Sequence, residues 1–377
     1  MIFVKNIGIV CEYNPFHNGH FKQLRGIEGS VCLMSGNFVQ RGEPAILDKY
    51  VRARAAVECG ASLVLELPLT CAVASAERFA DGAVEIFERL GCIDGLCFGS
   101  EEGDINNIMS TARALLQPEF KEYLQRELET GVSFPTARHR ALVAMGADAS
   151  LIERPNDILA VEYCKALVRR GSSIEPVTIR REGCYHTGTD CENPSASFLR
   201  TQDDWEGFVP RAAWELFRTA PKYALCKGER SILARLRSMR EADFENVAYG
   251  SEGLWSKLMR ACREERDLLS IVSAVKSKRY TYSRVMRMIL CAFLGITDRQ
   301  MQQPAPYVRV LAFDDVGRSI LRQMREGADI PIINVGQMPP DAAYWELERQ
   351  ANDLFALFSE DILPPGGDLR ERVFYKR

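Results

Sequence analysis

Two histidines three residues apart are the side chains best suited to chemistry in this sequence. His17 and His20 lie in the stretch IVCEYNPFHNGH and are two of the four histidines in the chain. A buried strand is predicted to end here and a helix to begin, so unpaired backbone N–H groups would face an anion. Gly19 would let phosphate come close, and imidazole N–H groups can stabilise a leaving pyrophosphate. The spacing predicts a phosphate site; the alternative is one capping and one exposed histidine.

Arg200 is a second candidate phosphate ligand. It follows Ser195 and Ser197 closely. Hydroxyls beside a guanidinium suit triphosphate binding because arginine presents a planar fork of donors. The alternative is that one of the serines caps a helix and Arg200 is solvated.

Other polar positions are expected at the ends of strands. Gly99 follows a predicted strand, where a backbone can approach a ligand; the alternative is an ordinary turn at the end of the strand. Arg41, Glu43 and Lys49 lie in a long polar loop after another strand. Long ordered loops at such an edge are often functional, but Lys49 could also be the solvated start of a helix.

The elements that would position these residues alternate between strand and helix. Apolar runs predict strands at residues 7–11, 31–34, 63–67, 95–98 and 174–179. Amphipathic stretches between them predict helices at residues 19–28, 48–59 and 75–90. This alternation predicts an α/β fold with a Rossmann-like parallel sheet. The simplest partition is a nucleotide-binding α/β domain over residues 1–205, followed by a mainly helical domain over residues 206–377.

Longer sequence motifs carry a resemblance to a known family. HNGH after the first strand is similar to the HxGH signature of the nucleotidyltransferase superfamily. The wider pattern resembles the bacterial tRNA(Met) cytidine acetate ligase family in EYNPFHNGH, MSGNFVQRGEPAILDK, LVLELP, FGSE, RPNDILAVEY, SASFLR, KRYTYSRVMR and PYVRVLAF. These motifs follow one another along nearly the whole chain.

The resemblance implies a reaction and a set of site residues. It implies an ATP-dependent ligase that activates acetate as acetyl-adenylate and acetylates N4 of the wobble cytidine of elongator tRNA(Met). Acetate and this tRNA are the expected partners, and ATP with Mg²⁺ the expected cofactors. Catalytic roles would fall on His17, His20 and Arg200, and ATP contacts on Val10, Cys11, Glu12, Tyr13, Asn14, Pro15, Phe16, His17, Asn18, Gly19, His20, Phe21, Lys22, Gln23, Gly99, Asn156, Arg180 and Arg181. Asn156, after Pro155, could instead cap a helix. The run from Arg181 to Thr187 departs from the family pattern: it is one residue shorter, and Thr187 rather than an acidic residue follows His186.

Charge along the chain predicts an RNA-binding region. Residues 211–287 contain 17 Lys and Arg against 9 Asp and Glu, a local net of +8, although the whole chain has a net charge of −3. Basic residues are densest between residues 276 and 287, where lysine and arginine could bind phosphates and tyrosine could stack on bases. The expected RNA-binding residues are Lys276, Lys278, Arg279, Tyr280, Tyr282, Arg284 and Arg287. The alternative is a solvated helix face with tyrosines in the core.

Composition limits the other possibilities. The twelve cysteines form no CxxC pair, and no metal-binding cluster is evident. No apolar run is long enough to cross a membrane, so we expect a cytoplasmic enzyme without a membrane segment, and we infer no protein partner. Two rival functions remain: an adenylyltransferase acting on a small phosphorylated metabolite, and a non-catalytic ATP-sensing RNA-binding module.

Overall fold

A mostly parallel sheet forms the centre of the computed structural model, which describes residues 5–181 and 194–377. Five strands run parallel in the spatial order β5-β2-β1-β6-β7. They are β1 (Asn6–Cys11), β2 (Gly29–Ser35), β5 (Leu63–Leu67), β6 (Gly95–Ser100) and β7 (Glu175–Arg180). All five coincide with predicted strands to within a few residues, and the predicted α/β class is confirmed.

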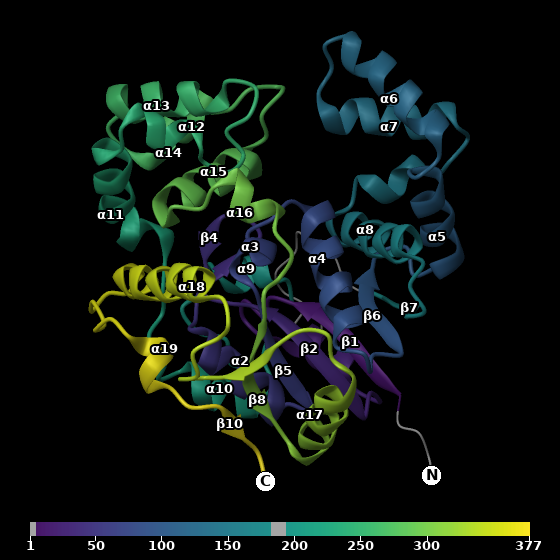
Figure 1. Cartoon of the computed structure of the whole chain (residues 1–377), viewed down its shortest axis with the longest axis vertical. Helices are drawn as coiled ribbons and strands as arrows, with labels where there is room; N and C mark the ends of the chain where they lie inside the picture. Colours follow the sequence, from purple (N-terminus) through teal and green to yellow (C-terminus); the bar gives the residue numbers. More distant parts are fainter. Residues whose placement is uncertain (1–4, 182–193) are drawn as a thin grey trace.

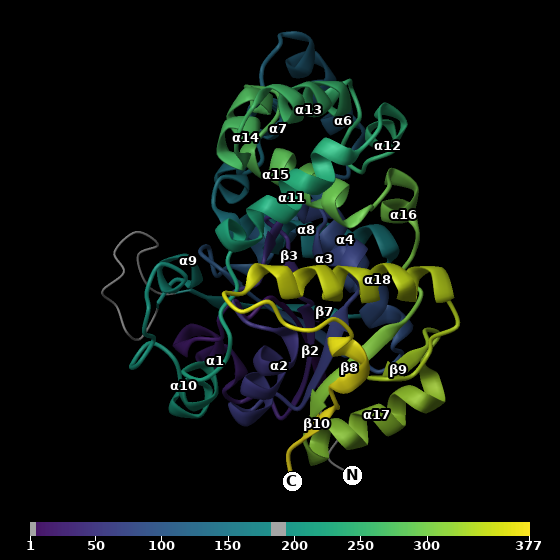
Figure 2. The ribbon, with the colours of Figure 1, turned by 90° about the vertical axis from the view of Figure 1, so that its left-hand side faces the viewer.

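Helices cover both faces of this sheet because alternate strand residues point to opposite sides. Val31 and Leu33 belong to the core beneath α4 (Ala76–Arg89), whereas Cys32 and Met34 belong to the core beneath α2 (Lys49–Glu58). α8 (Pro155–Arg170) packs beside α4, and α10 (Arg211–Phe217) packs beside α2. Figures 1 and 2 show the sheet between these two layers.

The sheet also takes strands from the C-terminal part of the chain. β8 (Val308–Phe313) pairs antiparallel with β5, and β9 (Ile332–Asn334) and β10 (Phe374–Tyr375) pair parallel with β8. The sequence analysis placed no strand beyond residue 179. Residues on both sides of the expected boundary at 205 therefore share one sheet.

Most of the remaining chain is helical. α11 (Leu225–Ser238), α13 (Leu254–Glu264), α14 (Leu268–Val275) and α15 (Tyr282–Leu294) pack together on one side of the molecule. α6 (Pro118–Glu129) and α7 (Phe134–Ala144) form a separate pair at the far end of α5 (Ile105–Ala114) and α8 (Figure 1). None of the helices in the described ranges is both long and apolar enough to span a bilayer.

Candidate active site

The strand order fixes where a ligand can bind. From β1 the chain crosses to β2 on one side of it and later to β6 on the other. Such a reversal leaves a crevice at the carboxyl ends of β1 and β6, which is the usual ligand position in open α/β sheets. The HNGH motif follows β1, and Gly99 lies at the end of β6. The fold thus brings together two regions that the sequence analysis selected separately.

The turn after β1 buries most of its large side chains. Tyr13 has φ 46°, in the left-handed region, and its ring is 1% exposed. Phe16 is fully buried, and Asn14 and Pro15 are buried as well. Within the predicted ATP-contacting run, the side chains of these residues belong to the core, so any contact they make with a nucleotide must come from the backbone.

The two motif histidines brace each other at the start of α1 (Asn18–Leu24). His17 is the N-cap, and its Nδ1 accepts a hydrogen bond from the Gly19 N–H at 3.1 Å. The His17 N–H in turn donates to Nδ1 of His20 at 3.3 Å. The rings are stacked with centroids 3.7 Å apart. A Cβ on Gly19 would lie 3.0 Å from the His17 ring, so glycine leaves the room that this arrangement needs.

These hydrogen bonds determine the tautomer of both rings. A nitrogen that accepts a hydrogen bond carries no proton, so a neutral imidazole with an accepting Nδ1 has its proton on Nε2. In the described part of the chain neither Nε2 has a hydrogen-bond partner. His17 and His20 therefore present two N–H groups that could donate to a ligand, and the capping role of His17 leaves its Nε2–H available for this.

The surroundings keep both rings neutral. Burial lowers the pKa of His17 to about 3, and the positive charges of Arg181 and Arg200 contribute. Burial, followed by His17 and Arg181, lowers the pKa of His20 well below its ordinary value. The charge of Arg181 thus acts on both histidines, and the charge of Arg200 acts on His17.

Arg200 is held against the beginning of the HNGH turn. Its Nη1 donates to the backbone carbonyl of Asn14 at 2.9 Å, and its Nη2 donates to Ser197 Oγ at 3.1 Å. Ser195 caps the short helix α9 (Ala196–Leu199), as the alternative interpretation expected. Arg200 is half-buried rather than freely solvated. Burial lowers its pKa, and the nearby Arg41 lowers it further.

A chain of contacts places Arg181 at the end of β6. Arg181 Nη1 donates to Asn156 Oδ1 at 3.1 Å, and Asn156 Nδ2 donates to Glu101 Oε1 at 2.7 Å. A Cβ on Gly99 would lie 3.1 Å from the Arg181 side chain. The cap of α8 is Arg154, followed by Pro155, so the alternative role of Asn156 as a helix cap is wrong. Glu101, which the sequence analysis did not select, orients Asn156.

Other predicted ATP contacts are less central. Gln23 donates to the backbone carbonyl of Cys97 on β6. Arg180 is exposed and packs against Gly103. Most of the unusual run from Arg181 to Thr187 lies outside the described residues.

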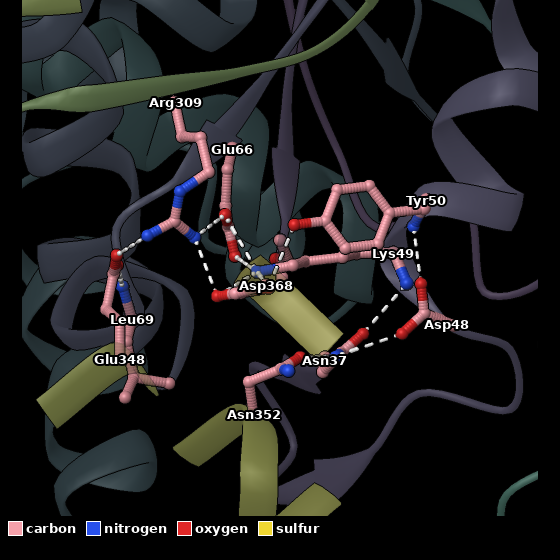
Figure 3. A network of polar contacts seen from close by, with 12 residues as sticks. Asn37, Asp48, Lys49, Tyr50, Glu66, Leu69, Arg309, Glu348, Asn352 and Asp368 are labelled. Atoms are coloured by element: carbon pink, nitrogen blue, oxygen red, sulfur yellow. Dashed lines mark hydrogen bonds and ion pairs between the residues drawn. The ribbon is translucent and has the colours of Figure 1, made fainter. Parts of the chain in front are cut away.

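Lys49 belongs to a buried charged network that the sequence analysis did not predict (Figure 3). Its Nζ lies 2.8 Å from Glu66 Oε1 and 2.8 Å from Asp368 Oδ1. Arg309 Nη1 reaches the same two carboxylates at 2.6 and 3.0 Å, and its Nη2 reaches Glu348 at 3.2 Å. Because Lys49 is only 2% exposed, its interpretation as a solvated helix start is wrong. The one sequence signal was the acidic Glu66 within an apolar strand.

The predicted RNA-binding residues do not all face outward. Lys276, Lys278, Arg279 and Tyr282 are exposed on the segment that joins α14 to α15 and on the first turn of α15. Tyr280, however, is 9% exposed, and its hydroxyl donates to the Glu252 carbonyl. It belongs to the core, as the alternative interpretation stated, and cannot stack on a base in this conformation.

Two further arginines of the set are partly buried on α15. Arg284 lies over the Tyr280 ring at 5.1 Å, and Arg287 lies over the Tyr249 ring at 5.2 Å. Within residues 5–181 and 194–377 there is no group of three or more His, Cys, Asp or Glu side chains that could bind a metal.

Comparisons with known proteins identify relatives of this chain. Residues 4–365 match the HIGH Nucleotidyl Transferase family. A tRNA(Met) cytidine acetate ligase from Acetivibrio thermocellus is 36% identical, with 88% of each chain covered. One from Caldanaerobacter subterraneus is 37% identical over 93% of this chain and 94% of its own.

Solved structures of Thermotoga maritima TmcAL are also similar. The apo structure has a TM-score of 0.89 at 30% identity, covering 98% of this chain and 99% of that chain. A second structure, bound with alpha-thio ATP, has a TM-score of 0.87 with the same identity and coverage.

Proposed function

The chain belongs to the tRNA(Met) cytidine acetate ligases of the HIGH nucleotidyl transferase family, and from this premise we propose that it activates acetate with ATP and acetylates N4 of the wobble cytidine of elongator tRNA(Met). The observation that carries the proposal is the stacked pair His17 and His20 at the switch point of the sheet, with both Nε2–H donors available. An ATP analogue is bound by the similar Thermotoga protein.

The first step is adenylation. The acetate oxygen attacks the α-phosphorus of ATP, and pyrophosphate leaves. Charge then develops on phosphate oxygens, where preorganised donors in a partly dehydrated site stabilise it. His17 and His20 supply neutral N–H donors, and Arg200 and Arg181 supply positive charge. The backbone N–H groups of Asn18, Gly19 and His20 at the start of α1 already donate within the chain, contrary to the expectation of unpaired groups there, so the donors to phosphate are side chains. No nucleophilic side chain is needed, because the reaction relies on placement and charge.

Magnesium would enter with the nucleotide. Mg²⁺ commonly binds triphosphate oxygens and water, with few protein ligands. That mode suits a site whose described residues offer no three-ligand cluster. The bound ion would neutralise charge on the triphosphate. A cytoplasmic location is part of this proposal, because the proposed substrate is a tRNA.

The tRNA would bind on the surface formed by Lys276, Lys278, Arg279 and Tyr282, with Arg284 and Arg287 at its edge. This surface lies in the basic region 211–287. Exposed lysine and arginine neutralise phosphates, and the exposed Tyr282 ring can stack on an unpaired base. Arg279 is exposed even though it contacts Glu252 at 3.2 Å.

The rival activities are distinguished by substrate-dependent pyrophosphate exchange. Labelled pyrophosphate should enter ATP when the protein is given acetate. Exchange with a small phosphorylated metabolite, and none with acetate, would favour the adenylyltransferase. ATP binding without exchange under any condition would favour the ATP-sensing module.

A further inference from the structure

A short hairpin lies between the proposed nucleotide site and the proposed RNA surface. Its strands are β3 (Phe38–Val39) and β4 (Glu43–Pro44), which pair antiparallel. Gly42 makes the turn with φ +81°, and its N–H donates to the Val39 carbonyl at 2.9 Å. Figure 1 shows β4 below α15, between the helical layer and the sheet. The tip, residues 40–43, carries two charged side chains.

The hairpin is attached on both sides. Toward the sheet, the Gln40 N–H donates to Glu12 Oε1 at 2.9 Å, and Glu12 directly follows β1. Toward the helical layer, Arg287 Nη1 donates to the Gln40 carbonyl at 3.4 Å. Gly42 packs so tightly on α15 that an added Cβ would lie 2.6 Å from the Met286 backbone. The tip therefore has a fixed position relative to both sites.

The two charged residues of the tip have no assigned partners. Arg41 is exposed and Glu43 is half-buried, and the side chain of neither makes a hydrogen bond or ion pair with the described residues. Their charges nevertheless act on a residue of the proposed nucleotide site and on a residue of the proposed RNA surface. Arg41 adds to burial in lowering the pKa of Arg200. Partial burial and the negative charge of Glu43 raise the pKa of Tyr282. Unpaired charges of opposite sign thus lie between a proposed phosphate ligand and a proposed stacking ring.

We propose that this hairpin tip receives the cytidine that is acetylated, with Glu43 accepting a hydrogen bond from its exocyclic amine and Arg41 binding a phosphate of the same nucleotide. A carboxylate is the usual acceptor for cytosine N4, and arginine is well suited to phosphate. The inference rests on the proposed function and adds the residues of its second step.

In that step the N4 lone pair forms a bond to the carbonyl carbon of the acetyl-adenylate. The bond from that carbon to the phosphate oxygen breaks, and its electron pair leaves with AMP. The amine loses one proton, which Glu43 accepts and later releases to water. Cytosine N4 is a weak, amide-like nucleophile, so a base in contact with it lowers the barrier. Such a base typically contributes about 10²–10⁴ in rate.

Three measurements on Glu43→Gln separate this role from others: acetate-dependent pyrophosphate exchange, tRNA affinity, and single-turnover transfer from preformed acetyl-adenylate. We expect exchange and affinity to stay within a few-fold of wild type, while transfer falls by roughly 10²–10⁴. Glu245→Gln, at an exposed site on α12 (Glu241–Glu245), is the matched control.

Arg41→Ala should weaken tRNA binding and lower its salt dependence by roughly 0.7–0.9 log units, with Arg322→Ala, at an exposed site on α17 (Asp315–Gly327), as the control. Transfer by Glu43→Gln at the wild-type rate would overturn the inference while leaving the proposed function intact. An equal loss of exchange and transfer would also overturn it, because Glu43 would then serve adenylation. Absence of acetate-dependent exchange in the wild type would instead refute the proposed function, and the inference with it.

Discussion

Replacing His17 with asparagine tests the protonation state that the structure assigns to the histidine pair. Asparagine is a good N-cap, so it can still accept the Gly19 N–H bond that His17 Nδ1 accepts at 3.1 Å. It cannot titrate and it lacks the Nε2–H donor. His17→Asn therefore separates the cap from the donor, whereas His17→Ala would remove both and cost about 1 kcal/mol for the cap alone.

The expected change in the free energy of unfolding with pH follows from the pKa of His17, which is about 3 in the folded protein and ordinarily 6.5. Because the folded pKa is lower, the unfolded chain binds more protons between these values. His17 thus contributes stability that is present above pH 6.5 and is lost as the pH falls. From pH 7 to pH 5 the free energy of unfolding should drop by about 2 kcal/mol through this residue, since one proton changes it by about 1.4 kcal/mol per pH unit.

Urea unfolding at pH 5, 6 and 7 measures this difference in the ligand-free proteins. Wild type should lose about 2 kcal/mol more than His17→Asn between pH 7 and pH 5. Adenylation by the variant at pH 7 should fall by roughly 10²–10³, as when one preorganised donor is removed. Equal pH dependence in the two proteins would show that His17 titrates normally, and the neutral-donor account would then be wrong.

Three other perturbations address the supporting contacts. Arg309→Met removes one cation from a buried network that includes Asp368, and it should lower the free energy of unfolding by about 3–5 kcal/mol. The melting temperature should therefore fall by roughly 4–6 °C, and an unchanged melting temperature would contradict this. Glu101→Ala should raise KM for ATP about tenfold by releasing Asn156, the worth of one charged hydrogen bond, with kcat for adenylation much less affected. Changing Lys278 and Arg279 to Ala should lower the salt dependence of tRNA binding by roughly 0.7–0.9 log units per lost phosphate contact and spare pyrophosphate exchange; loss of exchange with unchanged tRNA affinity would refute the RNA role.

The sequence alone was enough to predict those elements and motifs that depend only on residues close together in the chain. The end of β1 and the start of α1 lie within a few residues of each other, so the apolar run and the HNGH motif predicted both the turn and its place at the sheet edge. The five parallel strands were also recognisable, because each is a short buried run bounded by a helix. Gly8 at the centre of β1 shows how tight this packing is: a Cβ there would lie 2.8 Å from the Phe87 ring.

Contacts between distant segments could not be predicted in this way. Arg200 reaches the Asn14 carbonyl across 186 residues, and Lys49 meets Asp368 across 319. β8 is an apolar run whose periodicity does not distinguish a buried strand from a buried helix, and its antiparallel pairing with β5 depends on the whole fold. Tyr280 illustrates the same limit for side chains. A tyrosine among basic residues suits both stacking and the core, and only its three-dimensional environment decides between them.

The central claim is that this chain uses ATP to activate acetate and transfers the acetyl group to cytidine in tRNA. The most direct test incubates the protein with elongator tRNA(Met), ATP, Mg²⁺ and isotopically labelled acetate, and then digests the tRNA for nucleoside mass spectrometry. Labelled N4-acetylcytidine should appear at the wobble position, should require ATP, and should be almost absent with His20→Ala. Release of pyrophosphate without any labelled cytidine, or labelled cytidine formed without ATP, would contradict the account.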